Sequence, residues 1–515
     1  MKETSHRVLS DLDPKEVFYF FEEISSIPHG SGNTKAISDH LALFAEKRGL
    51  KYRQDDHDNI IIWKDASPGY EAAPAVILQG HMDMVCVAED GYETDFEKDG
   101  LILEENDGII TAKGTSLGGD DGIAVAMAMA ILDSDKITHP PLEVIITSDE
   151  EIGMLGAAAL DLNDVKGKIL LNLDSEDEGF LLVSCAGGAT VTTHMPVSFT
   201  HHDDPEKEGL ITGRLEISSL TGGHSGVEID KGRANAFVLL SRALDGLRLN
   251  AVENGASFYL SRLFGGGKDN AIPDSAYAIF SVKPGNAESL TDKMNDYITN
   301  CEKIFKNEFK NTDKDLSLKL TFPGGFPADG IMDERSTDRV IDMLRLLPNG
   351  IQNMSTDIPG LVQTSLNMGI LKTLKGSKAK ADGSDTGEVA VSFSVRSSVS
   401  SQKQEMIRRI RILMDVLGGS MSITGDYPAW EYMPDSKLRP VMEEVFEKQY
   451  GKKPVWQAIH AGVECGIFAS KIKGLDAVSF GPDMKDIHSP RESMDSKSVK
   501  RTWDYLLAVL EKLKS

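Results

Sequence analysis

Helix-like and strand-like apolar segments alternate along residues 17–186 of this chain. Two segments, residues 17–27 and 36–50, carry apolar side chains at helical spacing. Four short apolar runs have the length of buried strands: 59–63, 75–79, 142–147 and 168–173. A further, strongly apolar helix is predicted at 122–134. This alternation is typical of an α/β fold.

The pattern changes near residue 187 and returns near residue 427. Longer strands are expected at 213–220, 277–282, 316–322 and 389–395, with amphipathic helices at 234–247, 288–306, 336–347 and 403–417. Residues 374–387, rich in Gly, Lys and Ser, are predicted to form a hairpin loop. A chain of 515 residues exceeds what one core supports. We therefore expect a first domain of residues 1–186 and 427–515, interrupted by an inserted α+β domain of residues 187–426.

Charge and composition narrow the possible partners and location. The chain has 80 acidic and 55 basic residues and a net charge of −25, which repels nucleic acid and anionic membranes. Its start lacks the apolar segment of a secretion signal, and the longest apolar stretch, residues 123–132, is about half a membrane span. The four cysteines are widely spaced, which suits reduced thiols. These features predict a cytoplasmic protein without nucleic-acid or membrane partners.

Histidines and carboxylates follow the predicted strands of the first domain. In chain order they are His81 and Asp83, then Asp149, Glu150 and Glu151, then Asp174, and finally His488 after the run that begins at residue 477. The loop GTSLGG leads to Asp120 and Asp121 at the start of the apolar helix. Because ligands bind beyond the carboxyl ends of the strands in open α/β sheets, we expect these side chains to share one edge.

Carboxylate and imidazole ligands of this kind suit zinc or a similar divalent metal. If two ions bind, three carboxylates and two neutral imidazoles leave positive charge that would help hold a bridging hydroxide. Of the adjacent Glu150 and Glu151, one would serve as a ligand and the other as a proton acceptor. Simpler explanations exist for each residue alone: a helix N-cap, a solvated turn, or a hydrogen-bonded polar side chain. Their common position at strand ends favours the metal site.

An ordered series of motifs extends through the chain and includes FEEISSIPHGSGN, LQGHMDMV, GTSLGGDDGIAVA, TSDEEIGMLGA, LNLDSEDEG, SSLTGGHSGVEIDKGRANA, DNAIP, SVRSS, HAGVECGIF and FGPDMKDIHSPRE. Each motif is short, but in this order the series resembles the aminoacyl-histidine dipeptidases (Xaa-His or cytosol non-specific dipeptidases), which belong to the carnosinase and aminoacylase-type zinc peptidases. The resemblance implies a catalytic α/β domain with a central mixed sheet flanked by helices, interrupted by an inserted lid domain.

The resemblance also implies roles for the residues at the strand ends. Zinc is the expected metal, with manganese or cobalt as alternatives, and two ions are expected. The implied ligands are His81, Asp120 and Asp174 for one ion, and Asp120, Glu151 and His488 for the other. Asp83 would orient His81. Glu150 would be the general base that activates a water bridging the two ions and later protonates the leaving amine.

Residues of the inserted domain are implied to bind the substrate. His224 would stabilise the tetrahedral oxyanion once the lid closes, while Asn270 and Arg396 would grip the substrate, Arg396 at its terminal carboxylate. A surface arginine paired with an acid remains an alternative for Arg396, and a simple turn residue for Asn270.

A second histidine, His460, competes with His488 as the last metal ligand. We favour His488 because it occupies the family's terminal ligand position. His460 and Glu464 are then expected to shape the substrate pocket.

The leading hypothesis is metal-dependent hydrolysis of dipeptides, especially Xaa-His, with a small peptide as substrate. An alternative is an aminoacylase or carboxypeptidase that acts on N-acyl amino acids or longer peptides. An alternative of another class is a non-catalytic metal-binding or peptide-binding protein, which would not need Glu150 as a base. The resemblance also favours a homodimer formed through the lid, with His224 acting in its own or the neighbouring subunit's site.

Overall fold

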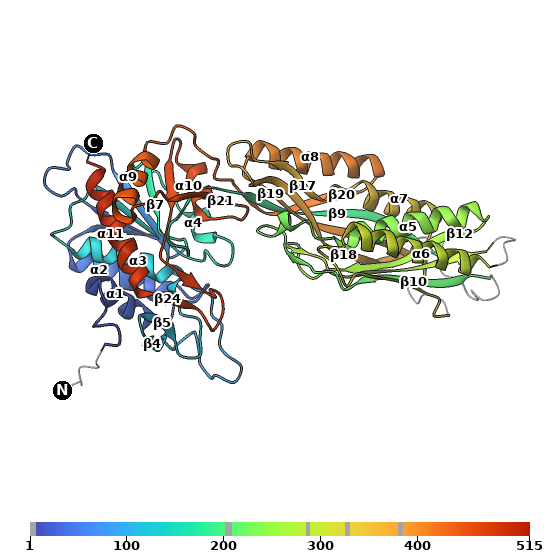
Figure 1. The fold of residues 1–515 in the computed structure, drawn as a ribbon, viewed down its shortest axis with the longest axis horizontal. Coiled ribbons are helices and arrows are strands. Elements are labelled where there is room, and N and C mark those ends of the chain that lie inside the picture. The colour runs from blue at the N-terminus through green and yellow to red at the C-terminus, as the bar shows by residue number, and fades with distance from the viewer. Residues whose placement is uncertain (1–6, 201–208, 285–288, 325–329, 380–384, 515) are drawn as a thin grey trace. The chain divides into compact units, whose positions relative to one another are not determined.

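The computed structural model describes residues 7–200, 209–284, 289–324, 330–379 and 385–514 (Figure 1). The chain forms two compact units. The first consists of Met1–Cys185, Trp430–Ile459 and Val463–Ser515, and the second of Ala186–Ala429 and His460–Gly462. Within the described residues, every helix is too short or too polar to cross a membrane.

An eight-stranded mixed sheet forms the centre of the first unit. Its strands, in spatial order, are β1 (Lys51–Gln54), β2 (Ile60–Lys64), β6 (Leu142–Thr147), β3 (Val76–His81), β7 (Ile169–Asn172), β22 (Asp476–Ser479), β8 (Phe180–Cys185) and β21 (Val455–Ile459). The strands β6, β3, β7 and β22 run parallel to one another, whereas β1 and β2 pair antiparallel. The carboxyl ends of the four parallel strands therefore meet at one edge.

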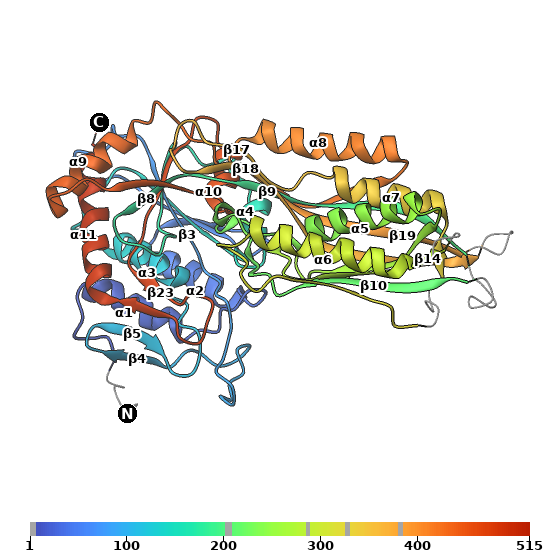
Figure 2. The same cartoon turned by 45° about the vertical axis from the view of Figure 1, so that its right-hand side comes forward.

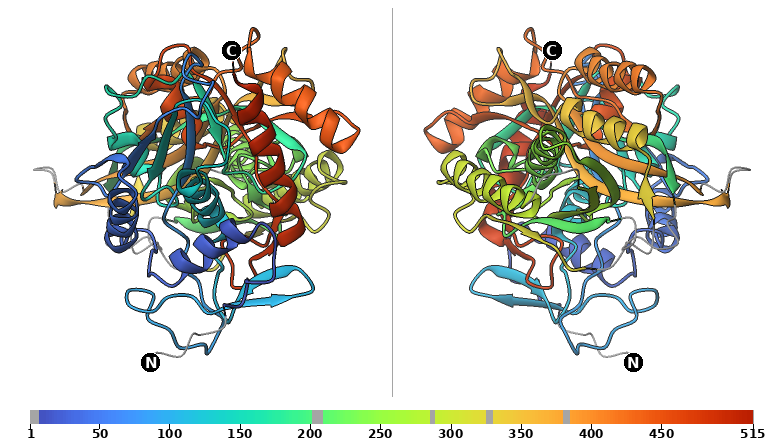
Figure 3. Two further views of the ribbon diagram at one scale, coloured as in Figure 1. Left: turned by 90° about the vertical axis from the view of Figure 1, so that its left-hand side faces the viewer. Right: turned by 90° about the vertical axis from the view of Figure 1, so that its right-hand side faces the viewer.

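Helices cover both faces of this sheet (Figure 3). They are α1 (Lys15–Ser25), α2 (Lys35–Lys47), α3 (Gly119–Asp133), α4 (Leu155–Ala159), α9 (Leu438–Tyr450), α10 (Glu464–Lys471) and α11 (Ser496–Lys512). On β3, Gly80 faces α3, while the adjacent Gln79 hydrogen-bonds Glu464 of α10. Since neighbouring strand residues point to opposite faces, α3 and α10 lie on opposite faces. This explains why all six residues of β3 are buried, the polar Gln79 and His81 included.

A small four-stranded sheet carries the loop that contains His488, the last predicted ligand. Its order is β23 (Met484–Lys485), β24 (Ser493–Asp495), β5 (Ile109–Ala112) and β4 (Leu103–Asn106). His488 lies in the loop between β23 and β24 with a positive φ of 58°. The expectation that His488 directly follows a strand of the central sheet is therefore wrong. After β22 the chain first crosses to this small sheet, and a loop supplies His488.

The second unit contains a ten-stranded sheet. Eight strands follow one another in space: β15 (Ser317–Thr321), β10 (Ile211–Ser218), β14 (Ala276–Lys283), β12 (Ser257–Gly265), β18 (Val362–Ala379), β19 (Asp385–Ser397), β9 (Gly187–Thr200) and β16 (Ile331–Met332). In addition, β17 (Gly350–Met354) pairs with β18, and β20 (Ser420–Tyr427) pairs with β9. A separate two-stranded ladder joins β11 (Gly223–His224) to β13 (Ala271–Ile272), and a short 3-10 helix, η1, spans Ile229–Lys231.

Four amphipathic helices pack against this sheet: α5 (Ala236–Glu253), α6 (Leu290–Glu308), α7 (Glu334–Leu346) and α8 (Ser400–Leu417) (Figure 2). On β10, Leu215 and Ile217 are buried in the same core as the helices, whereas Arg214 and Glu216 between them are partly exposed. The helices thus cover one face, as the polar alternation of the strands predicts. The predicted helix at 288–306 begins at Leu290, and residue 288 lies outside the described residues.

The hairpin loop expected at residues 374–387 is shorter than predicted. Strand β18 continues to Ala379 and β19 begins at Asp385, with Lys375 paired to Gly387. Residues 380–384 of the expected loop lie outside the described residues. Antiparallel pairing satisfies the backbone whatever the side chains, so polar residues extend the ladder where composition alone suggested a loop.

Candidate functional site

Strand register brings the first two candidate ligands together. His81 at the end of β3 lies opposite Thr147 of β6, and Gln79 lies opposite Asn172 of β7. Asp174, two residues beyond Asn172, therefore comes level with His81. Its Oδ1 lies 3.8 Å from Nε2 of His81.

Asp120 faces two histidines. It lies at the start of α3, where its backbone is not helical. Its Oδ1 is 3.1 Å from Nε2 of His81, and its Oδ2 is 3.2 Å from Nε2 of His488. Nε2 of His488 is also 2.8 Å from Oε1 of Glu151. The structure thus brings the five predicted ligands into one cluster, in which Asp120 contacts both histidines and each histidine lies near a further carboxylate.

Asp121 also belongs to this cluster, although no role was assigned to it from the sequence. Its ligand atom lies within 4.8 Å of those of His81 and Asp174. Oδ2 accepts the backbone N–H of His81 at 3.2 Å, and Oδ1 is without a hydrogen-bond partner among the described residues. A Cβ at Gly80 would collide with Oδ2 of Asp121 and with Cβ of Ala124. Glycine before His81 therefore permits the close approach of α3.

Asp83 links the turns after two neighbouring strands. Nδ1 of His81 lies 3.0 Å from the backbone oxygen of Asp83 and 3.6 Å from its Oδ1. The buried carboxylate accepts the backbone N–H groups of Glu150 at 3.0 Å and Glu151 at 3.3 Å, and the hydroxyl of Ser31 at 2.7 Å. Asp83 therefore holds the turn that carries both glutamates as well as the imidazole of His81.

The motif SIPHGSGN, residues 26–33, forms hydrogen bonds with the turns that follow β3 and β6. Ser31 and His29 exchange backbone hydrogen bonds with Met84, just after the β3 turn. The N–H of Gly32 donates to Oδ1 of Asp149 at 2.6 Å, in the β6 turn. The motif contributed to the family resemblance, but the structural role of Ser31 could not be inferred without the fold.

The pKa values reflect crowded, buried acids. Burial raises the pKa of Asp174 and of Glu150 well above the usual range, and neighbouring carboxylates add to the effect. Burial also opposes ionisation of Asp120, but hydrogen bonds from His488 and His81 outweigh it and lower the pKa of Asp120. Hydrogen bonds to Asp120 and Glu151 raise the pKa of His488 to about 10.

Divalent cations fit this donor set. The cluster holds more carboxylates than imidazoles, most of its side chains apart from His488 are buried or partly buried, and Oδ1 of Asp121 lacks a donor among the described residues. Buried carboxylates need such compensation by positive charge. Oxygen and imidazole ligands match divalent metals such as zinc. The two carboxylate oxygens of Asp120 face different histidines, His81 and His488.

His224 belongs to the second unit, where it ends β11. Its Nδ1 accepts the backbone N–H groups of Gly226 at 3.1 Å and Val227 at 3.2 Å, which places the imidazole proton on Nε2. Burial, together with the charge of Arg396, lowers the pKa of His224. His224 is thus a neutral imidazole whose remaining N–H is available as a donor.

Arg396 and His460 are both buried in the second unit, and the charge of Arg396 acts on His460. Arg396, on β19, is only 8% exposed, so it is not the surface arginine of the alternative explanation. Its Nη1 donates to the hydroxyl of Tyr427 at 3.2 Å, and its Nε has no partner among the described residues. Nε2 of the buried His460 lies 2.8 Å from Oγ of Ser365. Burial, Arg396 and His224 lower the pKa of His460 to about 3.

Asn270 and Glu464 have different surroundings. The backbone oxygen of Asn270 accepts the N–H of Ser225 at 2.8 Å, beside the β11 and β13 ladder of the second unit. Glu464 is fully buried in the first unit, where Oε2 accepts hydrogen bonds from Gln79 at 2.5 Å and Thr147 at 2.7 Å. These bonds hold Glu464 against the central strands.

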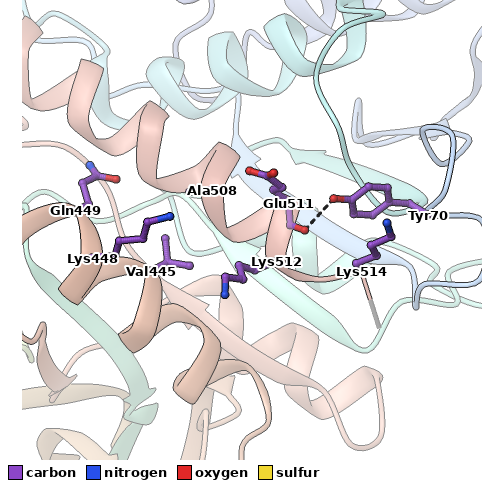
Figure 4. A pocket seen from close by; sticks show the side chains of 8 residues that line it. All are labelled: Tyr70, Val445, Lys448, Gln449, Ala508, Glu511, Lys512 and Lys514. Atoms are coloured by element: carbon purple, nitrogen blue, oxygen red, sulfur yellow. Dashed lines mark hydrogen bonds between the residues drawn. The ribbon is translucent and has the colours of Figure 1, made fainter.

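A separate surface pocket lies beside α9 and α11 (Figure 4). It is lined by Tyr70, Val445, Lys448, Gln449, Ala508, Glu511, Lys512 and Lys514, none of which is a candidate site residue. Tyr70 precedes β3, so the pocket lies toward the amino ends of the strands and away from His81. Lysines in the last turns of helices complement the helix dipoles, which accounts for them without a ligand.

Comparison with known proteins identifies the family. The model of peptidase family M20/M25/M40 matches residues 77–512. The cytosol non-specific dipeptidase of Escherichia coli (strain K12) is 34% identical over 507 residues, which cover 98% of this chain and 99% of that protein. The crystal structure of aminoacylhistidine dipeptidase from Vibrio alginolyticus has a TM-score of 0.88 and 33% identity, and covers 99% of both chains.

A more distant structure shares the fold alone. Aminopeptidase PepT from Bacillus cereus ATCC 10987 has a TM-score of 0.53 at 16% identity, and covers 98% of this chain and 100% of that chain. The family model and the two relatives that match nearly the whole chain show a peptide-bond hydrolase, and its acidic and histidine cluster suits a divalent metal. The chain belongs to peptidase family M20/M25/M40. The resemblance and the fold class inferred from the sequence are thereby confirmed.

Proposed function

We propose that this protein is a metal-dependent dipeptidase whose substrates include Xaa-His dipeptides. Two relatives that match nearly its whole length support this proposal, since one is named a non-specific dipeptidase and the other an aminoacylhistidine dipeptidase. The structural observation that carries it is the position of Glu150, next to a ligand set in which Asp120 faces both His81 and His488.

Five side chains would hold two divalent ions, with zinc as the proposed metal and manganese or cobalt as alternatives. The proposed ligands are His81, Asp120 and Asp174 for one ion, and Asp120, Glu151 and His488 for the other. When bound, such ions supply Lewis-acid chemistry, lowering the pKa of water and polarising the scissile carbonyl.

Glu150 would move the proton. It directly precedes the ligand Glu151, and its carboxylate groups with His81 and Glu151 within 4.8 Å. Its backbone N–H is held by Asp83, which restricts where its side chain begins. In this proposal Glu150 accepts a proton from the attacking water and delivers it to the leaving amine nitrogen.

Residues of the second unit would bind the substrate. The guanidinium of Arg396 can donate two parallel hydrogen bonds to a terminal carboxylate, and its Nε is not used by the described residues. His224 would donate its Nε2 proton in a hydrogen bond to the developing oxyanion. Asn270 would contribute to substrate binding, and His460 would shape the pocket as a neutral, buried side chain.

The variant Glu150→Gln tests the proposed chemistry. It should keep near-normal metal content, because Glu150 is not a proposed ligand, while dipeptide hydrolysis falls at least about a hundredfold. Both quantities are measured on the same preparation. Substantial remaining hydrolysis at full metal content would contradict the role of Glu150.

A substrate panel tests the specificity. Xaa-His dipeptides, other dipeptides, tripeptides and N-acetyl amino acids are compared with defined metals. Dipeptides should have the highest kcat/KM. Faster turnover of N-acetyl amino acids would favour an aminoacylase instead.

We also propose a cytoplasmic homodimer. The four cysteines are free, and three of them are buried, which suits a reducing compartment. Light scattering of the purified protein tests the dimer, and a monomer at assay concentration would contradict it. Cell fractionation tests the location, and export of the protein would contradict it.

A further inference from the structure

One buried carboxylate binds the whole loop that leads into α3. Glu492 is 3% exposed. Its Oε2 accepts the N–H groups of Leu117 at 2.8 Å and Gly118 at 3.1 Å. Its Oε1 accepts those of Gly119 at 2.8 Å and Asp120 at 3.3 Å. Both oxygens are therefore occupied by four consecutive backbone groups.

Without Glu492, these four backbone N–H groups would have few other hydrogen-bond acceptors. The first N–H groups of a helix have no partner within the helix, and a buried donor left unpaired is costly. A carboxylate at this end also interacts favourably with the helix dipole. The site is closely packed, since a Cβ on Gly119 would lie 3.3 Å from Oε1 of Glu492 and 3.1 Å from Sδ of Met484. Glu492 thus determines the path of the backbone as it reaches Asp120.

The same short segment carries a proposed ligand and this carboxylate. His488 and Glu492 both lie in the loop between β23 and β24, and the N–H of Glu492 donates to the backbone oxygen of Ser489 at 3.1 Å. The backbone N–H of Asp120 donates to Glu492, and the carboxylate of Asp120 lies beside the imidazole of His488. The segment therefore contacts both the backbone and the side chain of Asp120.

We propose that Glu492 is a positioning residue that fixes Asp120 so that its two oxygens face His81 and His488. The hydrogen bonds from Leu117–Asp120 to Glu492 join positions that are 372 to 375 residues apart in the chain. The consequence for metal binding rests on the proposed function. The consequence for the backbone does not, because it concerns only the hydrogen bonds between Glu492 and the main chain.

Hydrogen exchange of the metal-free protein tests the backbone part. The amides of residues 117–120 should be protected in the wild-type chain. In Glu492→Gln, one side-chain oxygen is replaced by an NH₂ group that cannot accept, so exchange at Leu117 or Gly119 should be at least about tenfold faster. Unprotected amides in the metal-free wild-type chain would overturn the proposal without any variant.

Glu143→Gln provides a matched control. Glu143 is also buried, and its carboxylate also accepts loop N–H groups, those of Lys166 at 3.0 Å and Gly167 at 2.7 Å. It lies near the amino end of β6, whereas the proposed ligands lie at the carboxyl ends of the strands. A general loss of stability would affect both variants, but a positioning effect on Asp120 should appear only in Glu492→Gln.

Metal affinity and the visible spectrum of the cobalt-substituted protein test the second part. Glu492→Gln should bind cobalt about 10- to 100-fold more weakly and with shifted absorption bands, the range expected when a supporting residue is lost. Glu143→Gln should keep both properties. Wild-type affinity and spectrum in Glu492→Gln, or an equal loss in Glu143→Gln, would overturn the proposal.

Glu492→Asp covers the case in which the glutamine variant fails to fold. It keeps the negative charge but is one methylene shorter, so it should reach fewer of the four amides and lose less metal affinity. Affinity and exchange rates in Glu492→Asp equal to those of the wild type would count against positioning. If exchange at residues 117–120 rises but dipeptide hydrolysis was never present, the positioning role stands and the proposed function fails.

Discussion

Oδ1 of Asp83 accepts the backbone N–H of Glu150 at 3.0 Å, so a side chain beyond β3 holds the main chain beyond β6. The proposed base is therefore located through its backbone. Because the same carboxylate also binds Ser31 and lies near His81, it couples the position of the base to that of a proposed ligand.

Asp83→Asn should reduce kcat/KM about 10- to 100-fold, as expected for a residue that supports metal ligands. An asparagine offers only one oxygen, so it cannot accept from Glu150, Glu151 and Ser31 together. Steady-state kinetics with parallel metal analysis measure the effect. Ser31→Ala is the milder control, since it removes one hydroxyl and leaves the carboxylate. A wild-type rate in Asp83→Asn would contradict this coupling.

Gly80→Ala should destabilise the first unit by about 1–3 kcal/mol, the cost of overpacking. The new Cβ would collide with Asp121 and with Ala124, which belongs to the body of α3. Urea unfolding of the metal-free protein measures the change. Gly267→Ala is the control, because among the described residues no atom other than those of its chain neighbours lies within 4 Å of the added Cβ. Equal stability of the two variants would show that α3 can move away at little cost.

Arg396→Lys should raise KM at least about tenfold for dipeptides with a free carboxylate, since a lysine keeps the charge but loses the paired hydrogen bonds. Dipeptide amides, which lack that carboxylate, should be affected much less. Comparing both substrates with both proteins isolates the interaction. An equal change for carboxylate and amide would indicate a structural role for Arg396 instead.

The depressed pKa of His460 should make the protein less stable in acid. Burial, Arg396 and His224 keep His460 neutral in the folded state down to about pH 3, whereas the unfolded chain binds a proton near pH 6.5. The contribution of the neutral His460 to the free energy of unfolding is therefore fully present above pH 6.5. It declines as the pH falls toward 3, by at most about 1.4 kcal/mol per pH unit. In His460→Gln, the free energy of unfolding of the chelated protein should fall less steeply between pH 6.5 and 4. Identical slopes would contradict a neutral, buried His460.

Chelation should abolish dipeptide hydrolysis and lower the Tm by several degrees, because a ligand that binds only the folded state stabilises it by about 2.7 kcal/mol at 100 times its Kd. Zinc, manganese or cobalt should restore both. Full turnover in a verified metal-free sample would contradict the metal site.

Much of the fold could be predicted from local patterns. The apolar residues of β3 and of α3 form unbroken, buried runs, so both elements could be predicted from the sequence. The shared edge of His81 and Asp174 followed from the parallel direction of their strands. The prediction that His488 directly follows a strand of the central sheet was wrong, because the passage of the chain through the small sheet leaves no periodic pattern in the sequence.

The sequence alone determined the alternating α/β pattern, and it predicts an inserted domain and a metal site, because periodicity and strand-end chemistry are local properties. Only the tertiary structure decided that Asp120 faces both histidines, that Asp83 holds the turn of Glu150, and that Glu492 supports the start of α3. Those relationships join positions tens to hundreds of residues apart, and they depend on packing between elements. A linear pattern of side chains does not contain that information.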